Sequence, residues 1–161
     1  MYRFLQLLLT STVVPEIEYG IIFQQNTSVL LFQDLYTGSW GFSSYRPKYP
    51  NSISSPYMAL FGAIAQGIAD TGYTYKDDFL VQNPPCQYGT TIYWYATVQT
   101  LHPPRLKNTR EYQNLRFIER EEVRQSFSTF TDDVEDWKQE GMRSSCLNRY
   151  YPTRTKRRLN G

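Results

Sequence analysis

The sequence predicts an α+β domain, and three observations indicate this class. Short β-branched and aromatic runs come first, a single long helical pattern follows, and further strand patterns then lead into short helices. This order favours a sheet packed against helices over regular alternation of strand and helix. With 161 residues, 40% apolar and 20% charged, the chain fits one domain with one sizeable core and excludes an intrinsically disordered protein.

Two apolar runs at the start of the domain predict a β-hairpin. Tyr19–Phe23 and Val29–Phe32 are rich in β-branched, aromatic and leucine residues and are separated by a short polar stretch. A further short strand is expected over Ser39–Phe42. Residues 43–55 are then expected to form a loop, because prolines and serines punctuate them.

A long helix is predicted to begin at Ser55-Pro56 and to end at Gly72. Serine is a favoured N-cap, proline suits the first helical position, and glycine suits the residue after a helix. The apolar residues recur at spacings of three and four and are expected to form one buried stripe: Tyr57, Leu60, Phe61, Ile64 and Ile68. Gly62 and Gly67 weaken a helix, so either another backbone approaches closely there or tertiary packing offsets the loss.

The second half predicts three strands and two helices. The strands are expected over Phe79–Val81, Gly89–Gln99 and Leu115–Glu119, and a short helix is expected from Glu121 toward Phe127. Thr131-Asp132-Asp133 is a favourable helix start, with acids at the positive end of a last helix that runs through Met142.

Several stretches, taken in order, resemble the Nudix hydrolases, most closely the asymmetrical diadenosine-tetraphosphate hydrolases. They are YGIIF, VLLFQ, GSWGF, ADTGYT, TTIYWYATV and EYQNLRFIEREEV. The resemblance implies a Nudix-type α/β/α sandwich with a mixed sheet. It places the domain at 18–147, after an N-terminal extension (1–17) and before a basic tail (148–161).

The family's defining box is degenerate in this chain. The family pattern is Gly, five residues, Glu, seven residues, then Arg-Glu-apolar-any-Glu-Glu-any-Gly-apolar, and Gly72 sets its register. The arginine position is then Ala65, the three helix glutamates are Gln66, Ala69 and Asp70, the upstream glutamate is Tyr57, and the first glycine is Asn51. In the family the three glutamates share one helix face and bind Mg²⁺ beside a diphosphate. A single aspartate is too little for this work, so we expect no catalytic residue, no metal and no cofactor.

Two residues are candidates for nucleotide contact through the resemblance. Tyr93 lies near the position where the resembled enzymes stack an adenine, and Glu111 lies where they carry an acid. Tyr93 is either a base-stacking ring or a core residue of an alternating strand. Glu111 is either a leftover base or metal ligand, or a solvated loop acid.

Charge is distributed unevenly along the chain. Of the 17 basic residues, five lie in the tail, which has no acid: Arg149, Arg154, Lys156, Arg157 and Arg158. The remaining 12 basic and 15 acidic residues give positions 1–148 a net charge of −3. The tail suits RNA, anionic lipid or an acidic protein surface, or it is a solvated terminus.

The N-terminal extension and the cysteines bear on location. Residues 1–17 hold one arginine and an apolar run, as a targeting segment or a docking segment would, and the run is too short to span a membrane. Cys86 and Cys146 are distant in sequence and do not predict a disulfide, which favours a reducing compartment. We therefore expect a mitochondrial location, or otherwise a cytoplasmic one.

The function that the sequence favours is a catalytically inactive Nudix-fold protein. It would act as a structural subunit of a larger assembly, with other protein subunits as partners, such as a mitochondrial respiratory complex or ribosome. One alternative is a nucleotide- or RNA-binding module without turnover. Another is an active Mg²⁺-dependent hydrolase of dinucleoside polyphosphates that uses Asp70 with Glu111 and Asp34.

Overall fold

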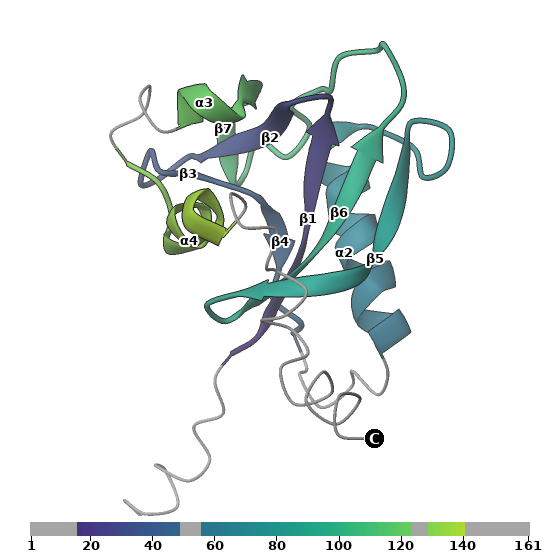
Figure 1. Ribbon diagram of the computed structural model, residues 1–161, viewed down its shortest axis with the longest axis horizontal. Helices are drawn as coiled ribbons and strands as arrows, with labels where there is room; N and C mark the ends of the chain where they lie inside the picture. The colour runs from purple at the N-terminus through teal and green to yellow at the C-terminus, as the bar shows by residue number, and fades with distance from the viewer. Residues whose placement is uncertain (1–15, 49–55, 124–128, 141–161) are drawn as a thin grey trace, which may run out of the picture.

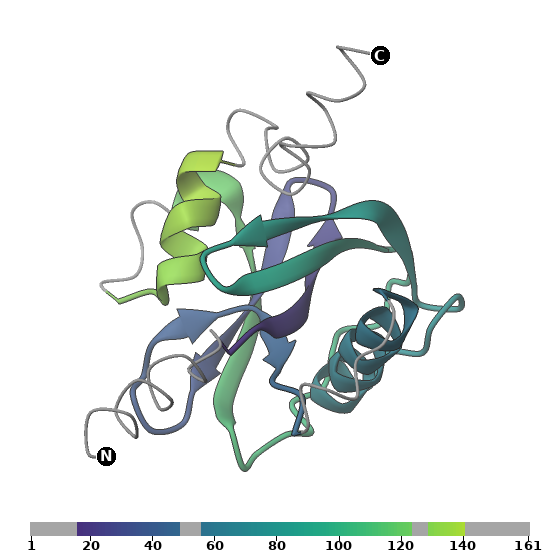
Figure 2. The same ribbon diagram turned by 90° about the horizontal axis from the view of Figure 1, so that it is seen from below.

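The computed structural model describes residues 16–48, 56–123 and 129–140, so the basic tail and most of the N-terminal extension lie outside the described part. Its elements are β1 (Glu18–Gln25), β2 (Ser28–Asp34), β3 (Trp40–Gly41), β4 (Ser43–Tyr45), α2 (Pro56–Thr71), β5 (Phe79–Tyr88), β6 (Thr91–Val98), β7 (Tyr112–Glu119), α3 (Arg120–Val123) and α4 (Asp132–Glu140). The predicted hairpin, long helix and later strands are confirmed. The predicted α+β sandwich is also confirmed, because the strands lie between α2 on one side and α4 on the other (Figure 1, Figure 2).

The sheet is mixed and has the order β3-β2-β1-β6-β5. β1 runs parallel to β6, whereas the other pairs are antiparallel, including β4 with β1 and β7 with β2. Successive side chains of a strand point to opposite faces. Ile21 and Phe23 of β1 therefore pack on the α2 side and Ile22 packs on the α4 side.

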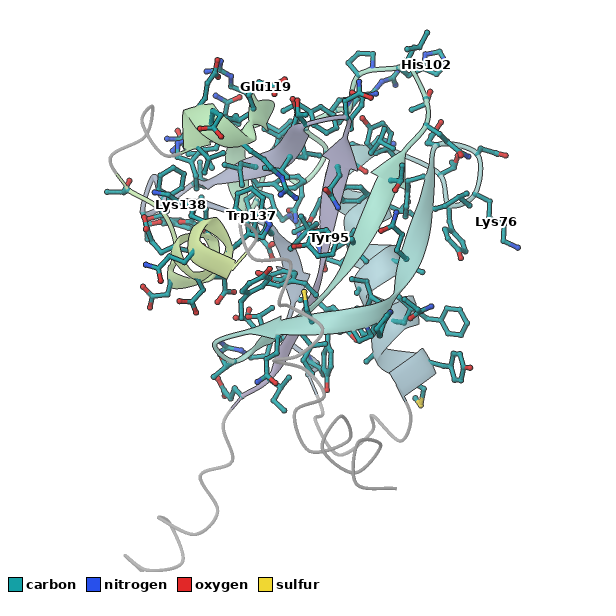
Figure 3. All side chains as sticks on the ribbon, in the orientation of Figure 1. Lys76, Tyr95, His102, Glu119, Trp137 and Lys138 are labelled. Atoms are coloured by element: carbon teal, nitrogen blue, oxygen red, sulfur yellow. The ribbon has the colours of Figure 1, made fainter. Side chains whose placement is uncertain are left out.

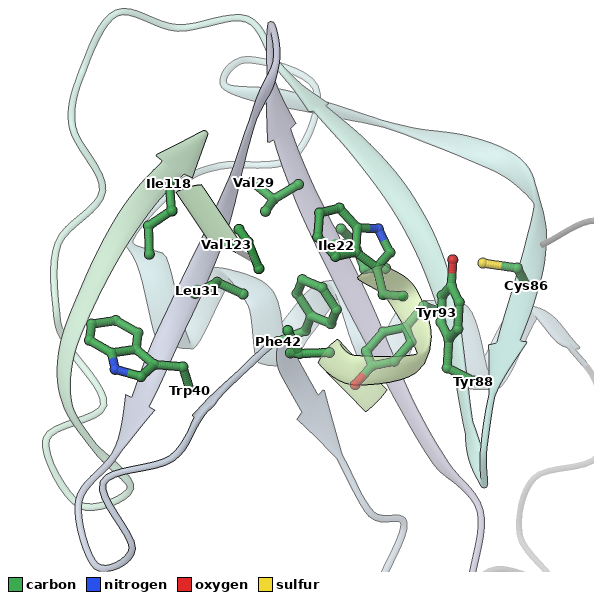
Figure 4. Close-up of a cluster of buried hydrophobic side chains, with 12 residues drawn as sticks. Ile22, Val29, Leu31, Trp40, Phe42, Cys86, Tyr88, Tyr93, Ile118 and Val123 are labelled. Carbon is green, nitrogen blue, oxygen red and sulfur yellow. The ribbon is translucent and has the colours of Figure 1, made fainter. Parts of the chain in front are cut away.

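Two hydrophobic clusters result, one on each face of the sheet. The cluster on the α4 side joins Ile22, Leu31 and Phe42 to Tyr93 and Trp137 (Figure 4). Its rings meet edge to face: Phe42 lies 5.4 Å from Tyr93 and 5.6 Å from Trp137 between centroids. Such contacts add about 0.5–1.5 kcal/mol per pair beyond the burial of area.

The predicted buried stripe of α2 is wrong. Tyr57 is 70% exposed and Phe61 is 64% exposed, while Leu60 and Ile68 are only partly buried, and of the five residues Ile64 alone is fully buried. The residues that face the sheet are instead mostly small ones: Ala59, Ala63, Ile64, Gly67, Asp70 and Thr71. Small residues face the sheet because large aromatic rings from the sheet already fill the space between it and the helix.

Gly62 and Gly67 are the points of closest approach between α2 and the sheet. A Cβ at Gly62 would lie 2.0 Å from the Tyr45 hydroxyl, and one at Gly67 would lie 2.9 Å from the Phe23 ring. The predicted backbone contact is therefore wrong, because the atoms that approach both glycines are side-chain atoms, chiefly of aromatic rings.

Gly62→Ala is expected to lower the free energy of unfolding by about 1–3 kcal/mol, because overpacking outweighs the gain in helix propensity. Urea denaturation followed by circular dichroism measures this change. In a Tyr45→Ala background the same substitution should be nearly neutral or stabilising, since the obstructing ring is gone. An equal loss in both backgrounds would exclude the contact as the cause.

Three further predictions differ from the structure. The expected loop 43–55 begins with a strand, β4, which pairs with β1 through Tyr45 and Tyr19. β5 extends seven residues past the predicted end at Val81, because a bulge between Gln82 and Cys86 accommodates two prolines on this edge strand. Cys86 is disulfide-bonded, with its partner outside the described residues, so the prediction of no disulfide is wrong. The argument for a reducing compartment rested on that prediction and is therefore lost.

Candidate functional site

A carboxylate at the end of α2 is the centre of the candidate site. Asp70 is fully buried and its side chain accepts three hydrogen bonds from neutral groups. Ser43 Oγ donates to Oδ2 at 2.8 Å, Gln66 Nε2 donates to Oδ1 at 2.9 Å, and Asn108 Nδ2 donates to Oδ1 at 2.8 Å. These donors come from β4, from the preceding turn of α2 and from the loop before β7.

Burial decides the protonation behaviour of Asp70. Desolvation raises the pKa of this carboxyl above its ordinary value, although the hydrogen bonds from Asn108, Ser43 and Gln66 each oppose the rise. The negative charge of Glu111 also raises this pKa. Asn108 Nδ2 donates to Glu111 Oε2 at 3.1 Å as well as to Asp70. One amide group thus connects the two acids that the resemblance had singled out.

The degenerate box positions do not assemble a metal site. Ala65 and Ala69 are exposed methyl groups, Gln66 contributes an amide, and Gly72 adopts φ 74° after the end of α2, as predicted. Within the residues that the structure describes, no three His, Cys, Asp or Glu side chains lie close enough to hold an ion. The present residues therefore do not fit the Mg²⁺ that this box holds in the hydrolases.

A strongly acidic cleft of about 800 Å³ is lined by Gln66 and Glu111, two residues of the Asp70 network, while Asp70 itself is buried behind it. Its charged lining consists of one cation, Arg46, and five carboxylates: Glu18, Asp34, Glu111, Asp132 and Asp133. Arg46 is itself paired with Glu16, with Nη1 and Oε2 2.7 Å apart. Without a divalent ion, such a lining repels a phosphate chain.

Asp34 holds its own turn. Its Oδ2 accepts hydrogen bonds from the backbone N–H of Thr37 at 2.7 Å and of Tyr36 at 2.9 Å. These bonds, that of Thr37 first, lower the pKa of the carboxyl. Asp34 is thus a turn-forming residue, which weakens the alternative in which it joins Asp70 and Glu111 as a metal ligand.

Tyr93 is a core residue that also forms part of the cleft wall. It is 1% exposed, and its hydroxyl donates to Asp133 Oδ2 at 2.8 Å, which ties β6 to α4. Burial raises the pKa of Tyr93 well above its usual value, and the charge of Asp133 raises it further. Of the two interpretations of Tyr93, this arrangement supports the structural one.

The sequence did not indicate Ser43 or Asn108 as site residues. Ser43 lay in a segment expected to be a loop, and Asn108 lies in a proline-containing connection. Neither belongs to a motif, so only the fold identifies them as partners of Asp70. The basic tail residues lie outside the described residues and stay a prediction.

Comparison with known proteins rests on structure alone. No family model matches the sequence, and no curated protein matches it. A NUDIX-family hydrolase from Clostridium perfringens superposes with a TM-score of 0.58 at 12% identity, covering 82% of this chain and 99% of that one. The chain has a Nudix fold.

Two other solved structures share this Nudix fold. The C. elegans Ap4A hydrolase has a TM-score of 0.51 at 14% identity and covers 85% of this chain and 96% of that one. The NUDIX domain of Shewanella oneidensis NrtR, solved in complex with ADP ribose, has a TM-score of 0.53 at 12% identity and covers 84% and 92%. Structural likeness at these sequence identities establishes the fold. Any statement about activity has to come from the residues of the site. Among the residues that the structure describes, no helix is long and apolar enough to cross a membrane.

Two partly buried acids give stability a definite pH dependence. Burial raises the pKa values of both Glu18 and Asp133. The folded state therefore binds protons more tightly than the unfolded chain, so this stability is complete below about pH 4 and is lost as pH rises through the raised values. Urea denaturation between pH 4 and 8 should show a shallower loss in Asp133→Asn than in the wild type. Identical slopes of stability against pH in the two proteins would contradict this assignment. Asp34, whose lowered pKa acts in the opposite direction, contributes equally to both proteins, so its effect cancels in the comparison.

Proposed function

We propose that this chain is a catalytically inactive Nudix-fold protein that serves as an accessory subunit of a larger assembly. The observation that carries the proposal is the Asp70 carboxylate, whose two oxygens already accept three hydrogen bonds from neutral donors. A magnesium ion needs several oxygen ligands in near-octahedral geometry. If Asp70 bound such an ion, it would lose its hydrogen bonds from Ser43, Gln66 and Asn108, and the polar groups of these residues would be left without partners.

The acidic cleft supports a protein partner with basic side chains. Five carboxylates against one paired arginine favour a lysine- or arginine-bearing surface and disfavour a polyphosphate. Tyr36, 83% exposed at the rim, offers an aromatic face that suits arginine. A mitochondrial assembly such as a respiratory complex or ribosome remains our proposed host.

Calorimetric titration with Ap4A and ATP, with and without Mg²⁺, tests the loss of activity. We expect no turnover in any condition, using an active Nudix hydrolase as the positive control. Mg²⁺-dependent cleavage that disappears in Asp70→Asn, with folding checked by circular dichroism, would overturn the proposal. Such a result would favour the alternative of an active dinucleoside polyphosphate hydrolase.

Co-purification from the native host tests the subunit role. The tagged chain is expected to migrate in an assembly much larger than the monomer. Glu111→Gln with Asp132→Asn, both in the cleft, should weaken the association, whereas Glu121→Gln with Glu122→Gln on α3 should not. A tagged chain that runs only as a free monomer argues against a subunit.

A second candidate is a nucleotide- or RNA-binding module without turnover. Its support is the retained cleft and the ADP ribose bound to the NUDIX domain of NrtR. The acidic lining and the buried Tyr93 weigh against it. Mg²⁺-independent heat on addition of ATP would favour it, and RNA affinity carried by the tail should fall steeply with salt.

A further inference from the structure

The outer face of α2 is apolar and uncharged along its length. Tyr57, Phe61, Ala65 and Ala69 follow one another at intervals of four residues and so share one exposed side of the helix. The charged residue of this 16-residue helix is Asp70, which is buried on the other side. A surface helix normally places charged side chains toward water. This face therefore has the composition of a covered surface.

None of the described elements covers this face. α2 packs on β1 and β4, and no described helix or strand lies on its outer side in either view (Figure 1, Figure 2). Side chains project freely from the end of α2 that lies away from the sheet (Figure 3). Met58, 44% exposed, extends the apolar surface beside Tyr57 and Phe61.

The composition of the N-terminal segment 1–15 suits this surface. Nine of its 15 residues are apolar or aromatic, and Arg3 is its one charged residue. The other terminal segment, 141–161, is a poorer match because it carries several arginines, and desolvating a charge against an apolar face is costly. The uncharged face and the nearly uncharged segment are complementary.

The entry point of the chain is near α2. Glu16 is held by its ion pair to Arg46, beside Tyr45. The Tyr45 hydroxyl in turn donates to the backbone carbonyl of Ala59 in α2 at 3.3 Å. Fifteen extended residues span up to about 50 Å, and the 16-residue α2 is about 24 Å long, so the segment can reach along its whole face.

We propose that segment 1–15 binds the outer face of α2 through Tyr57, Met58 and Phe61. The extension is then a docking segment that completes the hydrophobic packing of the helix. This assignment does not depend on whether the cleft is catalytic.

Photo-crosslinking in the full chain tests the proposal. With p-benzoylphenylalanine in place of Phe61, in a mixture of isotopically labelled and unlabelled chains, mass spectrometry is expected to find links to residues 1–15 of the same chain. The control places the same group at Leu101, which is 98% exposed and lies in the loop after β6. Links between two chains, links to another segment, or no link at position 61 would overturn it.

Deletion of residues 1–15 gives a second readout. We expect several-fold faster hydrogen exchange in α2 and stronger binding of a hydrophobic dye, and Phe61→Ser in the full chain should reproduce part of both changes. Leu101→Ser should reproduce neither. Unchanged exchange in a folded deletion variant would contradict the docking, and if the variant aggregates, the crosslinking result decides.

Discussion

Asp70→Ala is expected to lower the free energy of unfolding by about 3 kcal/mol or more. The change removes the acceptor for Ser43, Gln66 and Asn108 together. Ser43 is itself fully buried, so its hydroxyl has no access to water in compensation. Each buried polar group left unpaired costs about 1–3 kcal/mol. Urea denaturation at neutral pH measures the loss.

Two control variants separate the effect of the three hydrogen bonds to Asp70 from the general effect of burial. Asp70→Asn keeps an acceptor oxygen and should cost clearly less than Asp70→Ala. Glu111→Ala removes an exposed neighbour of the same network and should stay within about 0.5 kcal/mol, as surface substitutions do. A loss at Asp70→Ala no larger than that at Glu111→Ala would show that the three hydrogen bonds do not hold the site together.

Tyr93→Ala is expected to destabilise the domain by about 3–5 kcal/mol, the range for truncating a large buried aromatic side chain. Its ring packs against Phe42 and lies 6.1 Å from the ring of Tyr88 between centroids. Tyr93→Phe keeps the ring and should cost about 1–2 kcal/mol, because Asp133 loses a hydrogen-bond donor. Thermal and urea denaturation of both variants give the comparison.

Tyr36→Ala is the matched control for Tyr93→Ala, since Tyr36 is a tyrosine that is 83% exposed. It should change stability by no more than about 0.5 kcal/mol. If Tyr93→Ala proved as mild as Tyr36→Ala, the ring of Tyr93 would be free to contact a ligand, and the base-stacking interpretation would return.

The two faces of the helix show how far local pattern reaches. The start of α2 at Pro56 and its end before Gly72 follow from capping and backbone preferences, which are local. Which side is buried was predicted wrongly, because periodicity ranks side chains by hydrophobicity alone. In the fold, Tyr45 and Phe23 fill the space at Gly62 and Gly67, so the large residues of α2 turn outward.

Residue pattern alone was enough to predict the class of the fold, the hairpin, the long helix and the absence of the glutamate cluster from the third and fourth turns of that helix. Those features depend on residue type and on spacing within one element. Only the tertiary structure decided that Ser43 and Asn108 meet Asp70, that the cleft gathers five acids, and that Tyr93 is bonded to Asp133. The hydrogen bonds of Asp70 with Ser43 and Asn108, and of Tyr93 with Asp133, join residues 27 to 40 positions apart. Residues so distant in sequence meet only through the packing of the sheet and helices.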